Sequence, residues 1–200
     1  MSDILEYLFE SKAKARLLRF FLLNTEKEYT FSEVTKKNML KNQQARQVLK
    51  NLKAMKFIHE RRRSGDKYYS LNASFALFPE LKSLVVKSNV YPRSHGLSKV
   101  RNIGDVRLVL VSGIFINYSK SKVDIVLVVN SVSRGRLKNF MSNLEAEIGK
   151  EISYVLMNSE EFKYRLDMLD RFLLDFLEGP YDEIVNRIPG LKRTLMGLKK

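Results

Sequence analysis

Two apolar runs in the second half of the chain restrict its fold more than any other feature of the sequence. Residues 106–111 and 123–129 are rich in Val, Leu and Ile, a composition typical of buried strands. A polar loop over 117–122 separates the two runs. Apolar residues then recur at helical spacing after Ser133 and again after Ser159, each placed as a helix cap. These patterns predict strands over 106–111, 123–129 and 152–157, helices over 133–149 and 159–177, and a short final helix over 181–188.

The first half follows a different pattern, in which helical periodicity is followed by a single hairpin. Ser11 and Ser32 are placed to cap helices, and residues 29–31 favour a brief extended piece before Ser32. Ser64-Gly65-Asp66 is a turn signal between two extended runs. The predicted order is helices over 4–8, 11–23, 32–38 and 43–55, with a turn over 40–42, then a hairpin of strands over 57–63 and 67–71, then a helix beginning near Pro79.

The composition excludes several kinds of chemistry. The chain has 200 residues and no cysteine, which rules out disulfides, thiolate zinc sites, iron–sulfur clusters and a cysteine nucleophile. Its two histidines, His59 and His95, stand far apart, which argues against a histidine-rich metal centre. No apolar run reaches the length of a membrane span, and residues 1–6 lack the pattern of a signal peptide. We therefore expect a soluble cytoplasmic protein with no membrane partner.

The charge is large and unevenly distributed. Lys and Arg number 36 against 22 Asp and Glu, a net charge of +14. Residues 1–100 carry +11 of it and residues 101–200 only +3. A basic half joined to a nearly neutral half indicates a polyanion-binding domain with a second module.

Long polar side chains cover one face of the predicted helix over 43–55, opposite its apolar stripe. Basic side chains also gather at the tip of the hairpin. A solvated surface would explain either feature alone. Together they occur in the order needed for a helix to read the major groove and a hairpin to contact phosphates. The predicted DNA-contacting residues are Ser32, Lys41, Asn42, Gln43, Gln44, Arg46, Gln47, Lys50, Arg61, Arg62, Arg63 and Lys67.

The segment from about Ser11 to Asn72 resembles the winged helix-turn-helix superfamily of DNA-binding domains. The resemblance rests on the element order and on the two polar features just described. It implies that the helix over 43–55 is the recognition helix and that the hairpin is the wing. His59 falls on a wing strand, where a structural or surface role is expected.

Residues 104–188 resemble the small nucleotidyltransferase fold in their order of strands, glycine turn and helices. In that family a Gly-Ser turn cradles nucleotide phosphates, and two aspartates one residue apart hold magnesium. Here the turn is Ser112-Gly113, and Asp124 occupies the first aspartate position while Val126 occupies the second. The resemblance therefore implies a vestigial nucleotide site at Ser112, Gly113 and Asp124, with no catalytic residue, metal site or cofactor.

Three roles remain open for Asp124. It can bind one hydrated ion weakly, cap a loop, or pair with Lys120 or Lys122. The third predicted strand offers only Ser153 and Tyr154 at the position where the family often has another carboxylate.

The whole arrangement resembles a group of prokaryotic transcription regulators, most closely at residues 113–117, 159–166 and 170–172. The resemblance implies an α+β chain: an N-terminal winged helix-turn-helix and a C-terminal nucleotidyltransferase-like α/β domain with a small mixed sheet. The predicted domains are a DNA-binding domain over 1–88, a connecting segment over 89–103, a nucleotidyltransferase-like domain over 104–190 and a basic tail over 191–200.

The expected function is a sequence-specific regulator that binds double-stranded DNA at the nucleoid. The second domain would act as a sensor or dimerisation platform, with a homodimer partner and a small anionic or nucleotide effector as further expectations. One alternative is an active nucleotidyltransferase that uses the winged helix to hold its substrate. Another is a protein–protein adaptor, against which the basic first half argues.

Overall fold

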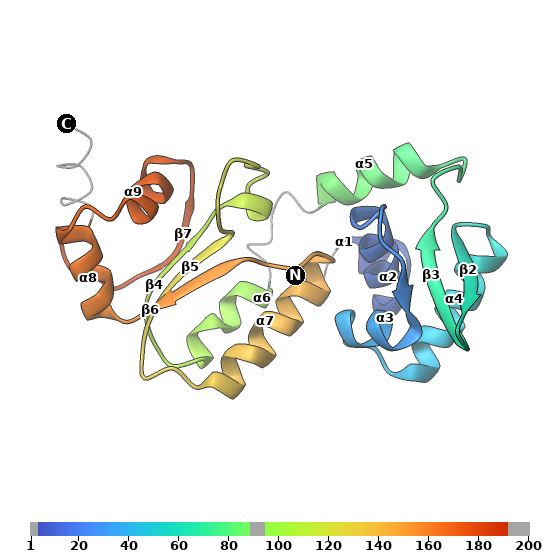
Figure 1. Ribbon diagram of the computed structural model, residues 1–200, viewed down its shortest axis with the longest axis horizontal. Coiled ribbons are helices and arrows are strands. Elements are labelled where there is room, and N and C mark those ends of the chain that lie inside the picture. Colours follow the sequence, from blue (N-terminus) through green and yellow to red (C-terminus); the bar gives the residue numbers. More distant parts are fainter. Residues whose placement is uncertain (1–3, 89–94, 192–200) are drawn as a thin grey trace. The chain divides into compact units, whose positions relative to one another are not determined.

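The computed structural model describes residues 4–88 and 95–191 (Figure 1). These residues form nine α-helices and two small sheets, one with three antiparallel strands and one with four mixed strands. The predicted α+β class with a small mixed sheet is therefore confirmed. Two compact units divide the described residues: 4–88, 95–96 and 141–151 form unit 1, and 97–140 and 152–191 form unit 2.

Unit 1 combines short helices with the three-stranded sheet. Its elements are α1 (Ile4–Leu8), α2 (Lys12–Leu23), β1 (Tyr29–Thr30), α3 (Phe31–Lys37), α4 (Asn42–Ala54), β2 (Ile58–Arg63), β3 (Asp66–Leu71) and α5 (Phe78–Ser88). The strands lie in the order β1-β3-β2. Leu17, Phe21 and Leu22 of α2 are fully buried in a core shared with residues from the sheet and from α4.

Helix α4 is held by its apolar stripe, as the periodicity predicted. Ala45, Val48, Leu49 and Leu52 are all buried, while the intervening side chains are exposed. The helix begins at Asn42, which the sequence placed in the preceding turn. Its N-cap residue Lys41 makes no side-chain cap hydrogen bond, so the usual capping signal is missing from the sequence.

Helix α3 is capped by Thr30, and the prediction of Ser32 as its cap is wrong. The Thr30 side chain accepts a hydrogen bond from the Glu33 backbone N–H, and the Glu33 carboxylate accepts from the Thr30 backbone N–H at 2.8 Å. The two together form a capping box. The Thr30 backbone donor holds the pKa of Glu33 below its usual value. Ser32 lies instead in the first turn, exposed.

Replacing the cap should weaken the fold measurably. We expect Thr30→Ala to lower the free energy of unfolding by about 1 kcal/mol, because the Glu33 N–H loses its acceptor. Thr30→Ser keeps the hydroxyl and should stay close to the wild type. Ser32→Ala is the matched control in the same turn, and urea unfolding measures all three. Equal losses in Thr30→Ala and Ser32→Ala would contradict the observed cap.

Unit 2 is built around the four-stranded sheet, in the order β6-β5-β4-β7. Its elements are η1 (Lys99–Asn102), β4 (Asp105–Val111), η2 (Gly113–Phe115), β5 (Ile125–Asn130), β6 (Tyr154–Met157), α8 (Ser159–Asp167), α9 (Arg171–Glu178) and β7 (Asp182–Asn186). Helices α6 (His95–Ser98) and α7 (Arg134–Ile148) contain residues of both units. Strands β5 and β6 are parallel, and the other pairs are antiparallel.

The two central strands are buried on both faces, as their apolar composition predicted. Residues 108–111 of β4 and 125–129 of β5 are buried without alternation. On one face, Leu108, Val126 and Val128 share a core with Phe162 of α8 and Leu173 of α9. The strands over 106–111 and 123–129 are thus confirmed to within a residue or two at their ends.

The predicted long helix over 159–177 is two helices. The chain turns at Leu169, which has a φ of 53°, and Asp170 caps α9 by accepting a hydrogen bond from Leu173 N–H at 2.9 Å. Helix α8 is capped by Asn158 and not by Ser159, because the Asn158 side chain accepts from Glu161 N–H at 2.7 Å. Buried residues continue at similar spacing in both helices, so periodicity alone did not reveal the break.

The predicted final helix over 181–188 is the strand β7. It pairs antiparallel with β4, and Val185 lies opposite Val109 with its side chain buried. Pairing with a distant strand overrides the local pattern here. In the predicted basic tail, Leu191 is buried, whereas Lys192, Arg193, Lys199 and Lys200 lie outside the described residues.

Candidate nucleic-acid interface

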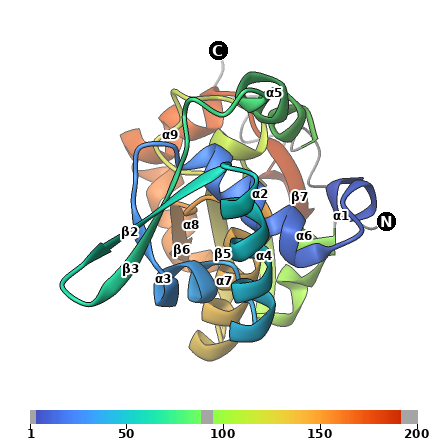
Figure 2. The ribbon, with the colours of Figure 1, turned by 90° about the vertical axis from the view of Figure 1, so that its right-hand side faces the viewer.

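All of the residues predicted to contact DNA are exposed. They form two sets within unit 1, one on α3 and α4 and one on the hairpin of β2 and β3. Figure 2 shows this hairpin extending away from the helices of the unit. Each set therefore presents its side chains to solvent.

Helix α4 carries no acidic residue along its whole length. The Arg46 guanidinium stacks on the ring of Phe31, 5.3 Å from its centroid, which holds the cation beside the start of α3. The Gln47 amide donates a long hydrogen bond of 3.5 Å to the Asn51 side chain one turn later. Amides and cations of this kind match the acceptors and donors on base edges.

One face of the hairpin is partly neutralised. Arg61 and Arg63 alternate onto the same side of β2. Both form ion pairs with the Glu28 carboxylate, at 3.5 and 3.6 Å. Arg63 also lies over the ring of Tyr68, 5.6 Å from its centroid. Glu28 therefore offsets part of the charge on this face.

On the opposite face of the hairpin a carboxylate pairs with lysines but not with Arg62. Arg62 lies directly across from Lys67 in the β2–β3 register. Lys67 pairs with Glu60 at 3.4 Å, and Lys53 of α4 pairs with the same carboxylate at 3.2 Å. Burial alone would raise the pKa of Glu60, but the hydrogen bonds from the two lysines bring it below its usual value. Among the described residues, Arg62 has no such carboxylate partner.

Three residues that organise this surface were missed by sequence reasoning. Glu28 and Lys53 carried no signal, because their partners lie elsewhere in the sequence and meet them only in the fold. Glu60 was detectable in principle. The turn at 64–66 fixes the hairpin register, and in that register Glu60 is the diagonal neighbour of Lys67.

The predicted vestigial site of unit 2 is a closed loop. Asp124 is buried, and its carboxylate accepts hydrogen bonds from Ile114 N–H at 2.9 Å, Ser153 N–H at 2.9 Å and Ser153 Oγ at 2.8 Å. Gly113 has a φ of 53°, and a Cβ there would overlap the Asp124 carboxylate. The Ser112 hydroxyl donates to the Pro180 carbonyl at 2.8 Å.

Of the three roles left open for Asp124, the geometry supports loop capping. Lys122 pairs with Asp175 at 2.8 Å and not with Asp124. Ser112 N–H donates to the Asp124 backbone carbonyl at 2.8 Å, so two N–H groups of the turn already have acceptors. Ser153, noted in the sequence only as a position without a carboxylate, supplies two of the three donors to Asp124.

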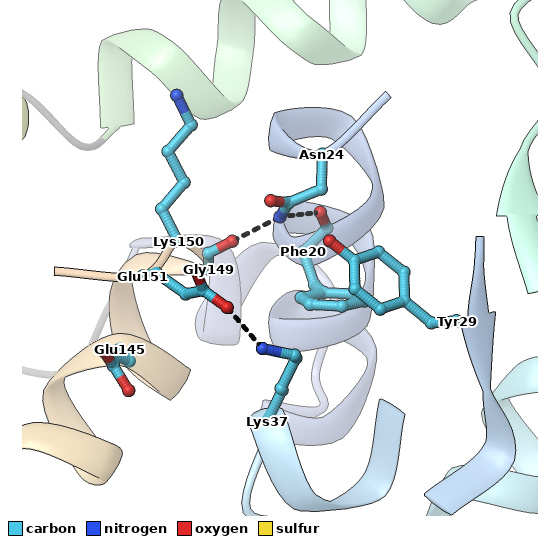
Figure 3. A pocket seen from close by; sticks show the side chains of 8 residues that line it. All are labelled: Phe20, Asn24, Tyr29, Lys37, Glu145, Gly149, Lys150 and Glu151. Carbon is cyan, nitrogen blue, oxygen red and sulfur yellow. Dashed lines mark hydrogen bonds and ion pairs between the residues drawn. The ribbon is translucent and has the colours of Figure 1, made fainter. Parts of the chain in front are cut away.

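A small pocket in unit 1 was not predicted (Figure 3). The Asn24 amide donates to the carbonyls of Phe20 and Gly149, both at 2.7 Å, and Lys37 pairs with Glu151 at 2.6 Å. Burial raises the pKa of Tyr29, which also lines it. The cavity of about 30 Å³ holds roughly one water molecule, so these contacts serve the fold.

No family model, curated protein or solved structure matches this chain. Across residues 4–88 and 95–191, no group of three His, Cys, Asp or Glu side chains is placed to hold a metal ion. In the same residues, no helix combines the length and apolar character needed to span a bilayer. The features from which a function can be inferred are the exposed basic surface of unit 1 and the closed loop at Asp124.

Proposed function

We propose that this chain is a sequence-specific regulator that binds double-stranded DNA, with unit 1 as a winged helix-turn-helix. One observation carries the proposal. An exposed helix face without carboxylates belongs to the same unit as a hairpin on which Arg62 and Lys67 directly oppose each other. The order of helices and hairpin supports the same assignment.

In this proposal α4 is the recognition helix. Gln43 and Gln47 project from the face opposite the buried stripe, where base edges would lie in the major groove. Lys50 on α4 and Lys41 at its N-cap are also exposed, and both would contact the flanking phosphates.

The hairpin is the wing. Like charges placed directly opposite each other on neighbouring strands are destabilising. The Arg62–Lys67 pair therefore costs stability in the free protein, and Glu60 offsets the charge of only one of the two. A phosphate group beside them would turn this repulsion into two favourable charge-assisted contacts.

For unit 2 we propose a nucleotidyltransferase-like fold that does not transfer nucleotides and acts as a sensor or dimerisation platform. Its support is the engagement of both Asp124 carboxylate oxygens within the protein. The alternative of an active nucleotidyltransferase would require these hydrogen bonds to break. It would also need a second metal ligand, where the strand has the buried Val126. No described contact favours that alternative.

Two substitutions separate base reading from phosphate binding. Gln47→Ala should weaken binding to the cognate site by about 1–3 kcal/mol and change binding to random DNA little. Arg62→Ala should weaken both by similar amounts without lowering protein stability, since it removes one member of a like-charge pair. The measurement is a fluorescence titration with a site selected from a random pool and with a random duplex.

Lys82→Ala on α5 is the control, because it removes one exposed charge outside the two predicted surfaces. It should leave both affinities near the wild-type values. If Gln47→Ala and Arg62→Ala have the same effect on both DNAs, α4 is not the recognition helix.

A further inference from the structure

The structure brings two basic stretches of unit 2 together. They are η1 and the beginning of α7, about thirty residues apart in the sequence. Ser133 N–H donates to the Ile103 carbonyl at 2.9 Å, and the Arg136 guanidinium donates to the Asn102 carbonyl at 3.4 Å. In Figure 1, α7 begins beside the segment that leads from α6 into β4.

Four of the exposed cations on these two stretches are Lys99, Arg101, Arg134 and Arg136. We call them the η1–α7 patch. Residues 97–104 and 131–140 contain no Asp or Glu. Nor does any of the four cations form an ion pair with a carboxylate in the part of the chain that the structure describes. The patch is thus an uncompensated positive surface, and three of its four cations belong to residues 101–200, whose net charge is only +3.

Gly135 stands between the two arginines of α7. Glycine is disfavoured in a helix relative to alanine. Nothing lies within 4 Å of the position that a Cβ at Gly135 would occupy, so packing inside the protein gives no reason for glycine there. An open backbone flanked by two arginines is well suited to the close approach of an external anion.

We infer that the η1–α7 patch binds the phosphate backbone of DNA, as a second contact surface in addition to that of unit 1. The inference rests on the proposed function. The patch consists only of charged side chains, which contact phosphates without regard to sequence. It therefore contributes affinity and salt dependence and no base specificity.

The test uses the full chain and a random-sequence duplex, titrated at several NaCl concentrations. Each lost phosphate contact reduces the magnitude of the log–log salt slope by about 1. We expect Arg134→Gln/Arg136→Gln to reduce it by about 2 and to weaken binding on random and selected DNA alike. Lys99→Gln/Arg101→Gln, in the other stretch, should act similarly. Lys120→Gln/Lys163→Gln is the matched control, since it removes two exposed charges of unit 2 outside the patch.

Thermal unfolding checks that each variant is folded. If one of the two double variants does not fold, the other still tests the inference. If both patch pairs keep the slope of the control while Arg62→Ala weakens binding, this inference is overturned and the proposed function stands. If the wild type binds no DNA, both are overturned. If the patch pairs lose binding to vesicles with 30% phosphatidylglycerol while the DNA slope stays unchanged, the patch is a lipid-binding surface and the inference is wrong.

Discussion

Raising the NaCl concentration from about 50 to about 200 mM should weaken the binding of this chain to double-stranded DNA about a thousandfold. The reason is counterion release. About six phosphate contacts give a log–log slope near −5, and a fourfold rise in salt then lowers the association constant by about three decades. The exposed cations of α4 and of the hairpin are numerous enough to make about six phosphate contacts. Fluorescence titration of a labelled duplex across the salt range measures the slope.

Glu28→Gln sharpens this prediction. Glu28 offsets Arg61 and Arg63 in the free protein, so its neutralisation should release both cations, tighten binding at low salt and steepen the slope. A polyanion-binding protein whose hairpin is not involved would respond to salt but not to this variant. A flat salt response of the wild type would remove the DNA hypothesis altogether.

Asp124→Ala should lower the free energy of unfolding by about 3 kcal/mol. The substitution leaves Ile114 N–H, Ser153 N–H and the Ser153 hydroxyl without their acceptor in a buried loop. An unsatisfied buried donor costs about 1–3 kcal/mol, and water entering the cavity offsets part of the total. Asp124→Asn should fall in between, because its amide keeps one acceptor oxygen. Urea unfolding is the measurement.

Asp175→Asn is the control, since this exposed carboxylate pairs only with Lys122 in the described contacts and should leave the free energy of unfolding close to that of the wild type. Stability of Asp124→Ala equal to that of the wild type would contradict the loop-capping role. Incubation with labelled ATP, GTP, CTP and UTP and Mg²⁺ or Mn²⁺ completes the experiment. Label transfer by the wild type that disappears in Asp124→Ala would support the enzyme alternative instead.

Elements fixed by local burial were predictable from the sequence. In α4, β4 and β5 the apolar residues of the sequence are the residues buried in the core. The spacing of these residues was therefore enough to predict each element. Strand β7 was not predictable in this way. Its conformation depends on pairing with β4, more than seventy residues earlier in the chain. The break at Leu169 was hidden for a related reason, since one residue of positive φ leaves the spacing of apolar side chains almost unchanged.

The candidate interface shows the same division. Exposure of the α4 side chains followed from the amphipathic pattern and that of the hairpin tip from its run of charged residues, whereas the effective charge of each arginine did not follow from either. The effective charge of an arginine depends on which carboxylates the fold brings close to it. Glu28 is far from Arg61 in the sequence, and the two form an ion pair only in the folded chain. The sequence also contained Asp124, but its role depends on Ser153, which reaches it across the parallel pairing of neighbouring segments.

Successive side chains of β2 point to opposite faces of the hairpin, so the two faces differ in charge. From the sequence alone, three consecutive arginines would suggest equal positive charge on both faces. The strand instead divides them between a side where Glu28 pairs with both Arg61 and Arg63 and a side where Arg62 lies opposite Lys67 and Glu60 pairs with Lys67 but not with Arg62. A polyanion approaching the two sides meets unequal potentials and is drawn to one of them. The hairpin would therefore favour one orientation of the protein on a duplex before any base is read.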